Sequence, residues 1–172
     1  MALNPNIARW IVASMCNYFI SQTTAKIMQT GFPNGTPPTP LPIYLEGQPQ
    51  TNGNKSAWAE LRIDGPFCQD LPGNVQKYAI TVSILILVAM NTQDMYQIYQ
   101  YCGDFANLFT DTIPIMKFGD GPDDDPTQMV DCMMLESTGK EHVAINHYGQ
   151  YDASIQMLQS TVDGMFYMTV TN

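Results

Sequence analysis

The sequence predicts an α+β domain in which two principal helices pack on a mainly antiparallel sheet of about five strands. Residues 78–90 form a charge-free run rich in β-branched residues, and such residues favour strands. Two other segments, one before and one after this run, carry apolar residues at helical spacing. Turn-forming residues separate the remaining short apolar segments. With 172 residues and 45% hydrophobic content, the chain has the size and composition of one domain with a buried core.

The predicted central strand spans residues 78–90. Apolar residues alternate in its first half and occupy both faces in its second half, so we expect both faces of the later half to be covered. The run is too short to cross a bilayer, which takes about 20 apolar residues. Asn91 or Thr92 then offers an N-cap for a covering helix. The apolar stripe of that helix consists of Met95, Ile98, Tyr99, Cys102, Phe105, Ala106 and Phe109.

An N-terminal helix is predicted to start at Asn4-Pro5, with asparagine as N-cap and proline in the first turn, and to end near Gly31. Residues 31–54 are rich in proline and predict an extended arm or loop with a short edge strand at 43–45. Two interpretations stay open for this arm: a stiff surface loop, or a segment that contacts a neighbouring subunit. The candidate contact residues are Pro37, Pro38, Pro40, Ile43, Tyr44 and Leu45.

The other strands are predicted from short alternating segments. One strand covers 56–63 and is closed by a turn at Asp64-Gly65-Pro66, and another turn at 71–74 leads into the central strand. Residues 112–126 are predicted as a loop. Strands at 129–136 and 141–147 are joined by a hairpin turn at 137–139. The last strand, 154–172, is predicted to break near Asp163-Gly164.

Charge is distributed unevenly along the chain. The net charge is −9, and residues 78–172 carry two Lys/Arg against twelve Asp/Glu. A surface that grips nucleic acid needs lysine and arginine for the phosphates, so this composition argues against such a surface. An acidic surface is compatible with DNA that slides past without binding. The first residues lack the basic and apolar pattern of a secretory signal peptide.

The densest carboxylate group is Asp120, Asp123, Asp124 and Asp125. A hard cation takes several oxygen ligands from one loop, but the spacing does not match a calcium loop, and Pro122 and Pro126 interrupt it. We therefore predict a solvated loop without a metal.

Other residues with potential chemistry are too few or too far apart for a reaction centre. His142 and His147 are five positions apart in a predicted strand, and this odd spacing places them on opposite faces. Glu136 and Glu141 flank the hairpin and are expected to be solvating groups. The cysteines are predicted to be reduced, mostly buried thiols. We predict no catalytic residue, metal or cofactor. The four cysteines are Cys16, Cys68, Cys102 and Cys132.

The order of the predicted elements resembles tail-terminator and tail-completion proteins from the necks of tailed bacteriophages. Three stretches are similar to parts of such neck proteins: Trp58-Ala59-Glu60-Leu61-Arg62-Ile63-Asp64-Gly65-Pro66, Phe118-Gly119-Asp120-Gly121-Pro122-Asp123-Asp124, and Gln159-Ser160-Thr161-Val162-Asp163-Gly164-Met165-Phe166-Tyr167-Met168. None of these stretches is a catalytic signature. The high content of methionine and tyrosine, with only 13% charged residues, is also typical of a surface adapted to subunit contacts.

The resemblance implies a structural role in the virion neck, after assembly in the host cytoplasm. Members of the family form homo-oligomeric rings, commonly hexamers, that terminate the tail tube and join it to the head–tail connector. Expected partners are other copies of the chain, the tail tube protein and the connector or adaptor protein, with DNA passing through unbound and no membrane. In such a ring the acidic loop is a candidate for lining the channel. Two alternatives are a capsid or adaptor protein of the same particle and a small enzyme with a carboxylate or metal site at 120–125.

Overall fold

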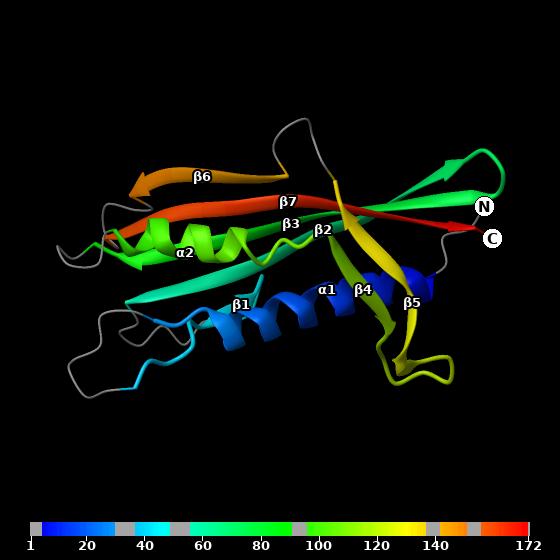
Figure 1. Cartoon of the computed structure of the whole chain (residues 1–172), viewed down its shortest axis with the longest axis horizontal. Coiled ribbons are helices and arrows are strands. Elements are labelled where there is room, and N and C mark those ends of the chain that lie inside the picture. Colours follow the sequence, from blue (N-terminus) through cyan, green and yellow to red (C-terminus); the bar gives the residue numbers. More distant parts are fainter. Residues whose placement is uncertain are drawn as a thin grey trace.

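The computed structural model describes residues 5–29, 37–48, 56–90, 96–136, 142–150 and 156–171. These residues form two helices and seven strands in one sheet, so the α+β class is correct, but the sheet has more strands than the five or so predicted. The elements are α1 Pro5–Lys26, β1 Ile43–Leu45, β2 Ala57–Leu71, β3 Val75–Ala89, α2 Gln97–Ala106, β4 Thr112–Lys117, β5 Asp125–Leu135, β6 Val143–Gln150 and β7 Met157–Thr171 (Figure 1).

The sheet is antiparallel except for the parallel pairing of β1 with β2. Its main order is β1-β2-β3-β7-β5-β4. β3 pairs along its whole length with β7, while β5 and β6 share the opposite edge of β7. β6 takes residues 158–164 of that edge, and β5 takes only residues 166–167. β5 and β6 therefore meet at the middle of β7.

The sheet curls around α1 as a half-barrel. α1 contacts β1 and β2 near one end of the strand order and β4 at the other, which a flat sheet does not allow. α2 lies on the same side, over β3, β7 and β6 (Figure 1). The buried residues of both helices join one core with the even-numbered residues of β3. We call this side the inner face and the opposite side the outer face.

The later half of β3 is covered on both faces, as predicted. On the inner face, Ile84 and Ile86 are fully buried in the main core. On the outer face, Leu85 and Leu87 belong to a second, smaller cluster. Trp58 is part of that cluster and is thus a packed aromatic residue of the sheet. Burying such side chains contributes about 1.5–3 kcal/mol each, so β3 is the centre of stability. The second cluster contains Trp58, Leu85, Leu87 and Met157.

Two of the predicted boundaries were wrong because backbone pairing overrides local signals. α1 starts at Pro5 but ends at Lys26, not near Gly31. Past that point the chain pairs with the proline-rich segment: the Leu41 N–H donates to the Ile27 carbonyl over 2.8 Å. β2 continues through Asp64-Gly65-Pro66, where a bulge with Gly65 at φ +111° shifts the register and lets pairing resume. The predicted cap Asn4 lies outside the described residues.

The predicted break in the last strand is also wrong, because β7 runs unbroken through Gly164. A Cβ atom at this position would lie 2.5 Å from a ring carbon of Phe109. Glycine is therefore needed for the close approach of Phe109 to the sheet, and it does not end the strand.

β4 was predicted as loop and is a strand. Ile113 and Ile115 alternate into the core, and Pro114 lies between them on an exposed position. β4 is the last strand of the sheet, so the missing N–H of proline does not interrupt a central ladder. A short segment that contains proline is typical of a loop, so the local sequence alone does not indicate this strand.

α2 follows the predicted stripe in part. Ile98, Cys102 and Phe105 are buried, but Tyr101 is buried in place of the predicted Tyr99. The helix starts at Gln97. The predicted N-caps Asn91 and Thr92, the stripe residue Met95 and the hairpin turn at 137–139 lie outside the described residues.

Candidate functional site

The most accessible element of the sheet is β6. Seven of its eight residues are exposed, from Ala144 to Gln150. Ile145 and Tyr148 are large hydrophobic residues with exposed fractions of 42% and 59%. Within the described part of the chain β6 pairs with β7 alone, so no described strand borders its other edge.

The edges at β1, at β4 and along the free part of β2 carry features that discourage strand pairing. β1 has only three residues, β4 contains Pro114 and Lys117, and the free part of β2 contains a bulge and charged residues. Short length, proline, charge and bulges are the usual protections of edge strands. β6 contains no Asp, Glu, Lys, Arg or Pro, and its one irregularity lies between His147 and Gly149. It is therefore the edge best suited to pairing with another strand.

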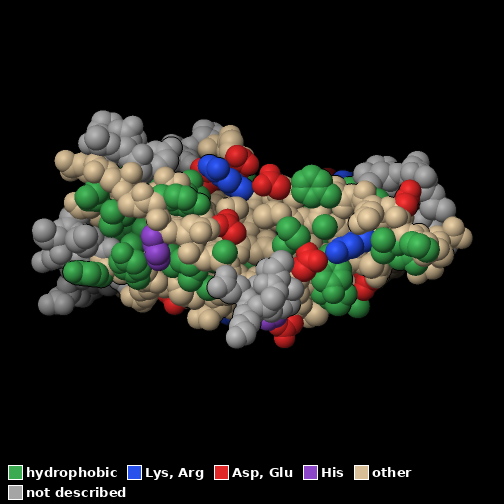
Figure 2. All heavy atoms as spheres, turned by 90° about the horizontal axis from the view of Figure 1, so that it is seen from above, with side chains coloured by type: hydrophobic (Ala, Val, Ile, Leu, Met, Phe, Trp, Pro, Cys, Tyr) green, Lys and Arg blue, Asp and Glu red, His purple; other side chains and the backbone are tan. Residues whose placement is uncertain are grey.

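An aromatic surface adjoins this edge where α2 meets β6. The rings of Tyr99 and His147 lie 4.7 Å apart between their centroids. Tyr96, before the start of α2, is 74% exposed. Figure 2, which views the molecule from the side on which β6 lies, shows hydrophobic side chains gathered around a histidine at this end. Exposed tyrosine and histidine at a strand edge are typical of a protein contact surface.

On the inner face of the sheet, His147 of β6 and Ser160 of β7 form a pair that resembles part of a catalytic site. His147 Nδ1 lies 2.7 Å from the Ser160 hydroxyl, and the same hydroxyl hydrogen-bonds to the Cys102 thiol. Ser160 is only 1% exposed, so a substrate does not reach its oxygen. Burial raises the pKa of the Cys102 thiol, which keeps it protonated and unreactive. The chain of contacts fastens β6 and α2 to β7, and it supplies no accessible nucleophile.

The two histidines lie on opposite faces, as expected. His147 packs on α2 from the inner face, whereas His142 lines a small outer pocket with Asp163. Glu136 forms an ion pair with Lys77, with 3.4 Å between Oε1 and Nζ. Glu141, predicted as its solvating neighbour, lies outside the described residues.

The acidic loop is fastened to α1 by one of its four aspartates. The Asp124 Oδ1 atom accepts hydrogen bonds from Arg9 over 2.6 Å and from the Trp10 indole over 2.7 Å. Its Oδ2 atom accepts the Gly121 N–H over 2.7 Å. The side chain is 1% exposed. Asp124 is therefore a structural anchor, and the expectation of a fully solvated loop was wrong at this residue.

These contacts determine which carboxylates of the loop are available to a partner. The Trp10 indole, the Gly121 N–H and the Arg9 guanidinium hold the pKa of Asp124 below its ordinary value. The Thr127 hydroxyl and N–H do the same for the pKa of Asp125. Only Asp120 and Asp123 stand exposed. In the described ranges no group of three or more His, Cys, Asp or Glu side chains is arranged to hold a metal ion.

Part of the proline-rich arm belongs to the sheet of its own chain. Ile43, Tyr44 and Leu45 form β1 and pair with Ala59–Leu61, and Leu41 is buried in the core. Pro37, Pro38 and Pro40 are exposed. The described residues 37–48 thus complete one edge of the sheet, while the rest of 31–54 lies outside the described ranges. Among the candidate contact residues, only Pro37, Pro38 and Pro40 are exposed and outside the sheet, so they are the ones left to contact a neighbouring subunit.

The four cysteines are free thiols. Cys102 is buried, Cys16 and Cys132 are half-buried, and Cys68 is exposed on β2. Burial raises the pKa of Cys16 as it does that of Cys102. The prediction of buried thiols is thus right for Cys102 and wrong for Cys68. Neither described helix is long and apolar enough to span a membrane.

Comparison with known proteins gives evidence on the fold. The sequence matches no protein-family model and no curated protein. Among solved structures, one chain superposes with a TM-score of 0.58 over 95% of this chain and 96% of its own length, at 9% sequence identity. At that identity the similarity establishes a shared fold and carries no information on function.

Proposed function

We propose that the chain is a structural subunit of a homo-oligomeric ring, and that the ring belongs to the neck of a tailed bacteriophage, where it terminates the tail tube and joins it to the head–tail connector. The observation that supports self-assembly is the uncharged, exposed edge of β6. The neck role rests on the resemblance of the element order and of the three sequence stretches to neck proteins. A hexamer is the favoured ring.

The charge of the chain supports assembly at β6 over other surfaces. A chain with a net charge of −9 repels its own copies, so two copies approach most easily where neither carries a carboxylate. β6 is such a segment, and strand pairing through main-chain hydrogen bonds needs no special side chains.

A lysine on the edge tests the assembly. Ile145→Lys and Tyr148→Lys each place a charge on an exposed position, as natural edge strands do, so the fold should be retained. We expect the wild-type chain to sediment as a ring and both variants to sediment as smaller species with unchanged circular dichroism. Met129→Lys is the matched control, since Met129 is an exposed hydrophobic residue on β5, and it should leave the ring intact.

A wild-type chain that stays monomeric at high concentration would refute the ring, and rings formed by both lysine variants would refute the β6 contact. Imaging of virions with an antibody against the chain tests the neck role. Labelling along the capsid would favour the alternative, a capsid protein of the same particle.

The exposed aspartates of the loop extend the proposal to the channel. Asp120 and Asp123 would repeat in every subunit, and a ring of like charge in a narrow passage repels DNA phosphates. Asp124, which is held against α1, would not contribute to this lining. The variant Asp120→Asn/Asp123→Asn should assemble normally and slow DNA ejection at low salt. Normal ejection by this variant would place the loop away from the channel.

A further inference from the structure

The outer face of the sheet carries a row of apolar side chains at the end away from α2. Four residues lie in register across four strands: Phe67 on β2 pairs with Ala79 on β3, Ala79 with Tyr167 on β7, and Tyr167 with Met134 on β5. Phe67 is 63% exposed, and Met134 and the neighbouring Met165 are also exposed. Both described helices pack on the other face of the sheet, so neither of them covers this row.

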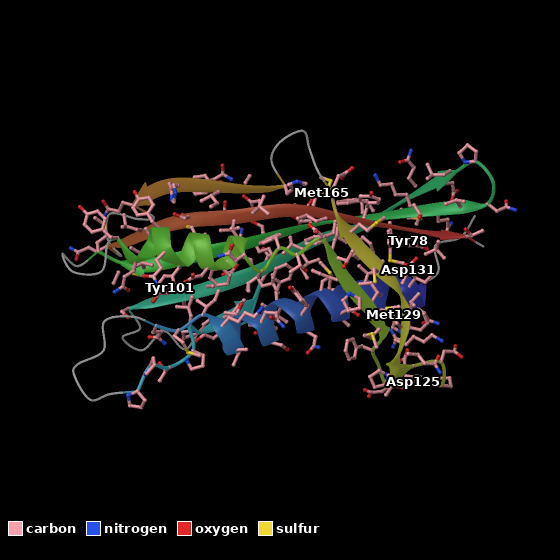
Figure 3. The ribbon with its side chains drawn as sticks, viewed as in Figure 1. Tyr78, Tyr101, Asp125, Met129, Asp131 and Met165 are labelled. Carbon is pink, nitrogen blue, oxygen red and sulfur yellow. The ribbon has the colours of Figure 1, made fainter. Side chains whose placement is uncertain are left out.

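A pocket of about 210 Å³ adjoins the row where β5 and β6 diverge from the edge of β7. Figure 3 shows Met165 at this junction. The walls are mostly apolar and the rim is acidic. Its lining residues include Thr81, Glu136, Ala144, Asp163, Gly164 and Met165.

The carboxylate of Asp163 is held in place at the rim. It accepts hydrogen bonds from the hydroxyls of Ser83 and Thr161 and from the Asn146 amide. None of these three donors is a cation. Glu136, on the other side, is paired with Lys77, whose ammonium also lies 4.7 Å from the centre of the Tyr167 ring.

The balance of charge on this part of the outer face is negative. Among its described residues, Asp64, Glu136 and Asp163 provide three carboxylates and Lys77 provides one ammonium, while the guanidinium of Arg62 is paired with Glu60 and Glu46. A second copy docked through the same face would bring the same three carboxylates together, and like charges across an interface cost several kcal/mol. Nucleic acid is disfavoured for the same reason. The complementary occupant is basic.

We propose that this surface docks a different protein, which lays an apolar segment along the row from Phe67 to Met134 and inserts an arginine or lysine side chain into the pocket. The apolar stem of such a side chain fits between Met165 and Ala144, and its cationic head reaches Glu136 and Asp163. The proposal concerns a surface other than the β6 edge, and it holds whether or not the chain forms a ring.

Methionine methyl resonances in NMR test the proposal on the full chain, because Met134 and Met165 flank the surface, whereas Met15 and Met168 are buried. The probes are three peptides, Leu-X-Leu-X-Leu with both ends blocked, in which X is arginine, its uncharged analogue citrulline, or glutamate. We expect the arginine peptide to shift the signals of Met134 and Met165 and not those of Met15 and Met168. It should bind at least about tenfold more tightly than the glutamate peptide, with citrulline between them.

Glu136→Gln should weaken binding of the arginine peptide about threefold to tenfold, and the remote, exposed Asp123→Asn should leave it unchanged. Equal affinity for the three peptides, no shift of Met134 and Met165 at millimolar peptide, or unchanged binding by Glu136→Gln would each overturn the proposal. Shifts of these two signals on concentrating the protein alone would place a second copy on the surface and would also overturn it.

Discussion

Among the strands that pair with β7, β3 and β6 have central residues that differ little in chemistry. Val162 pairs with Ile84 of β3 on one side and with Ile145 of β6 on the other. Both isoleucines lie in uncharged segments, yet Ile84 is 0% exposed and Ile145 is 42% exposed. The difference comes from position in the sheet. β3 lies between β2 and β7, and its inner face shares one core with both helices, whereas β6 is bordered by a described strand on one side only. The burial of a strand therefore depends more on the elements that surround it than on its own residues. Burial in turn decides whether the strand serves folding or binding.

The largest expected effect is a difference in unfolding free energy between aspartate variants of these two isoleucines. Ile84→Asp buries an unpaired carboxylate in the core and should cost more than about 4 kcal/mol, a large part of the stability of a typical domain. Ile145→Asp leaves the new carboxylate in water and should change the unfolding free energy of the isolated chain by about 0.5 kcal/mol or less. Chemical denaturation measures both. Similar stability of the two variants would show that the assignment of the central strand is wrong.

The contrast between β3 and β6 also shows how far the sequence predicts this protein. β3, α1 and β1 were predictable because their apolar periodicity or flanking prolines are local signals. β4 was missed because Pro114 is typical of loops, and only the position of β4 at the sheet edge makes proline acceptable there. Gly164 was read as a break, since its partner Phe109 lies 55 residues away by sequence number.

The candidate site was less predictable than the fold. The exposure of β6 depends on where the helices pack, and its one local signal is the absence of charge over eight residues. The anchoring of Asp124 depends on Arg9 and Trp10, which lie 115 and 114 positions away. A sequence pattern shows the density of aspartates in this loop but not which of them is turned inward. The row from Phe67 to Met134 comes from four strands and exists only after they pair.

An intermediate effect is expected within β7, the strand that the other two share. Gly164→Ala brings a methyl group within 2.5 Å of the Phe109 ring, and such overpacking costs about 1–3 kcal/mol. Gly103→Ala is the matched control: it lies within α2 and has no atom within 4 Å of the new methyl. This control should raise stability by up to about 1 kcal/mol, because alanine favours the helix. Thermal unfolding that ranks the two variants in the opposite order would contradict the packing of Phe109 on Gly164.

The smallest expected effect applies the same comparison to two adjacent aspartates. Asp124→Asn removes the negative charge that faces Arg9 and replaces one of the two oxygens that accept from Arg9, Trp10 and Gly121 with an NH2 donor, so it should lower the melting temperature. Asp123→Asn changes an exposed residue and should leave the melting temperature nearly unchanged. The loss at Asp124 should be modest, because Arg9 is 46% exposed and solvent weakens its ion pair.

The dependence of this difference on pH follows from the lowered pKa of Asp124. A carboxyl with a lower pKa in the folded than in the unfolded state stabilises the fold above its unfolded pKa of about 3.9, and this contribution is lost as the pH falls through the folded value. The gap in melting temperature between wild type and Asp124→Asn should therefore be constant from pH 7 to about 5 and shrink below about pH 4. Differential scanning calorimetry across this range measures the gap. A gap that stays the same down to pH 2.5 would mean that the charge of Asp124 contributes nothing and that the loop is held by its uncharged contacts.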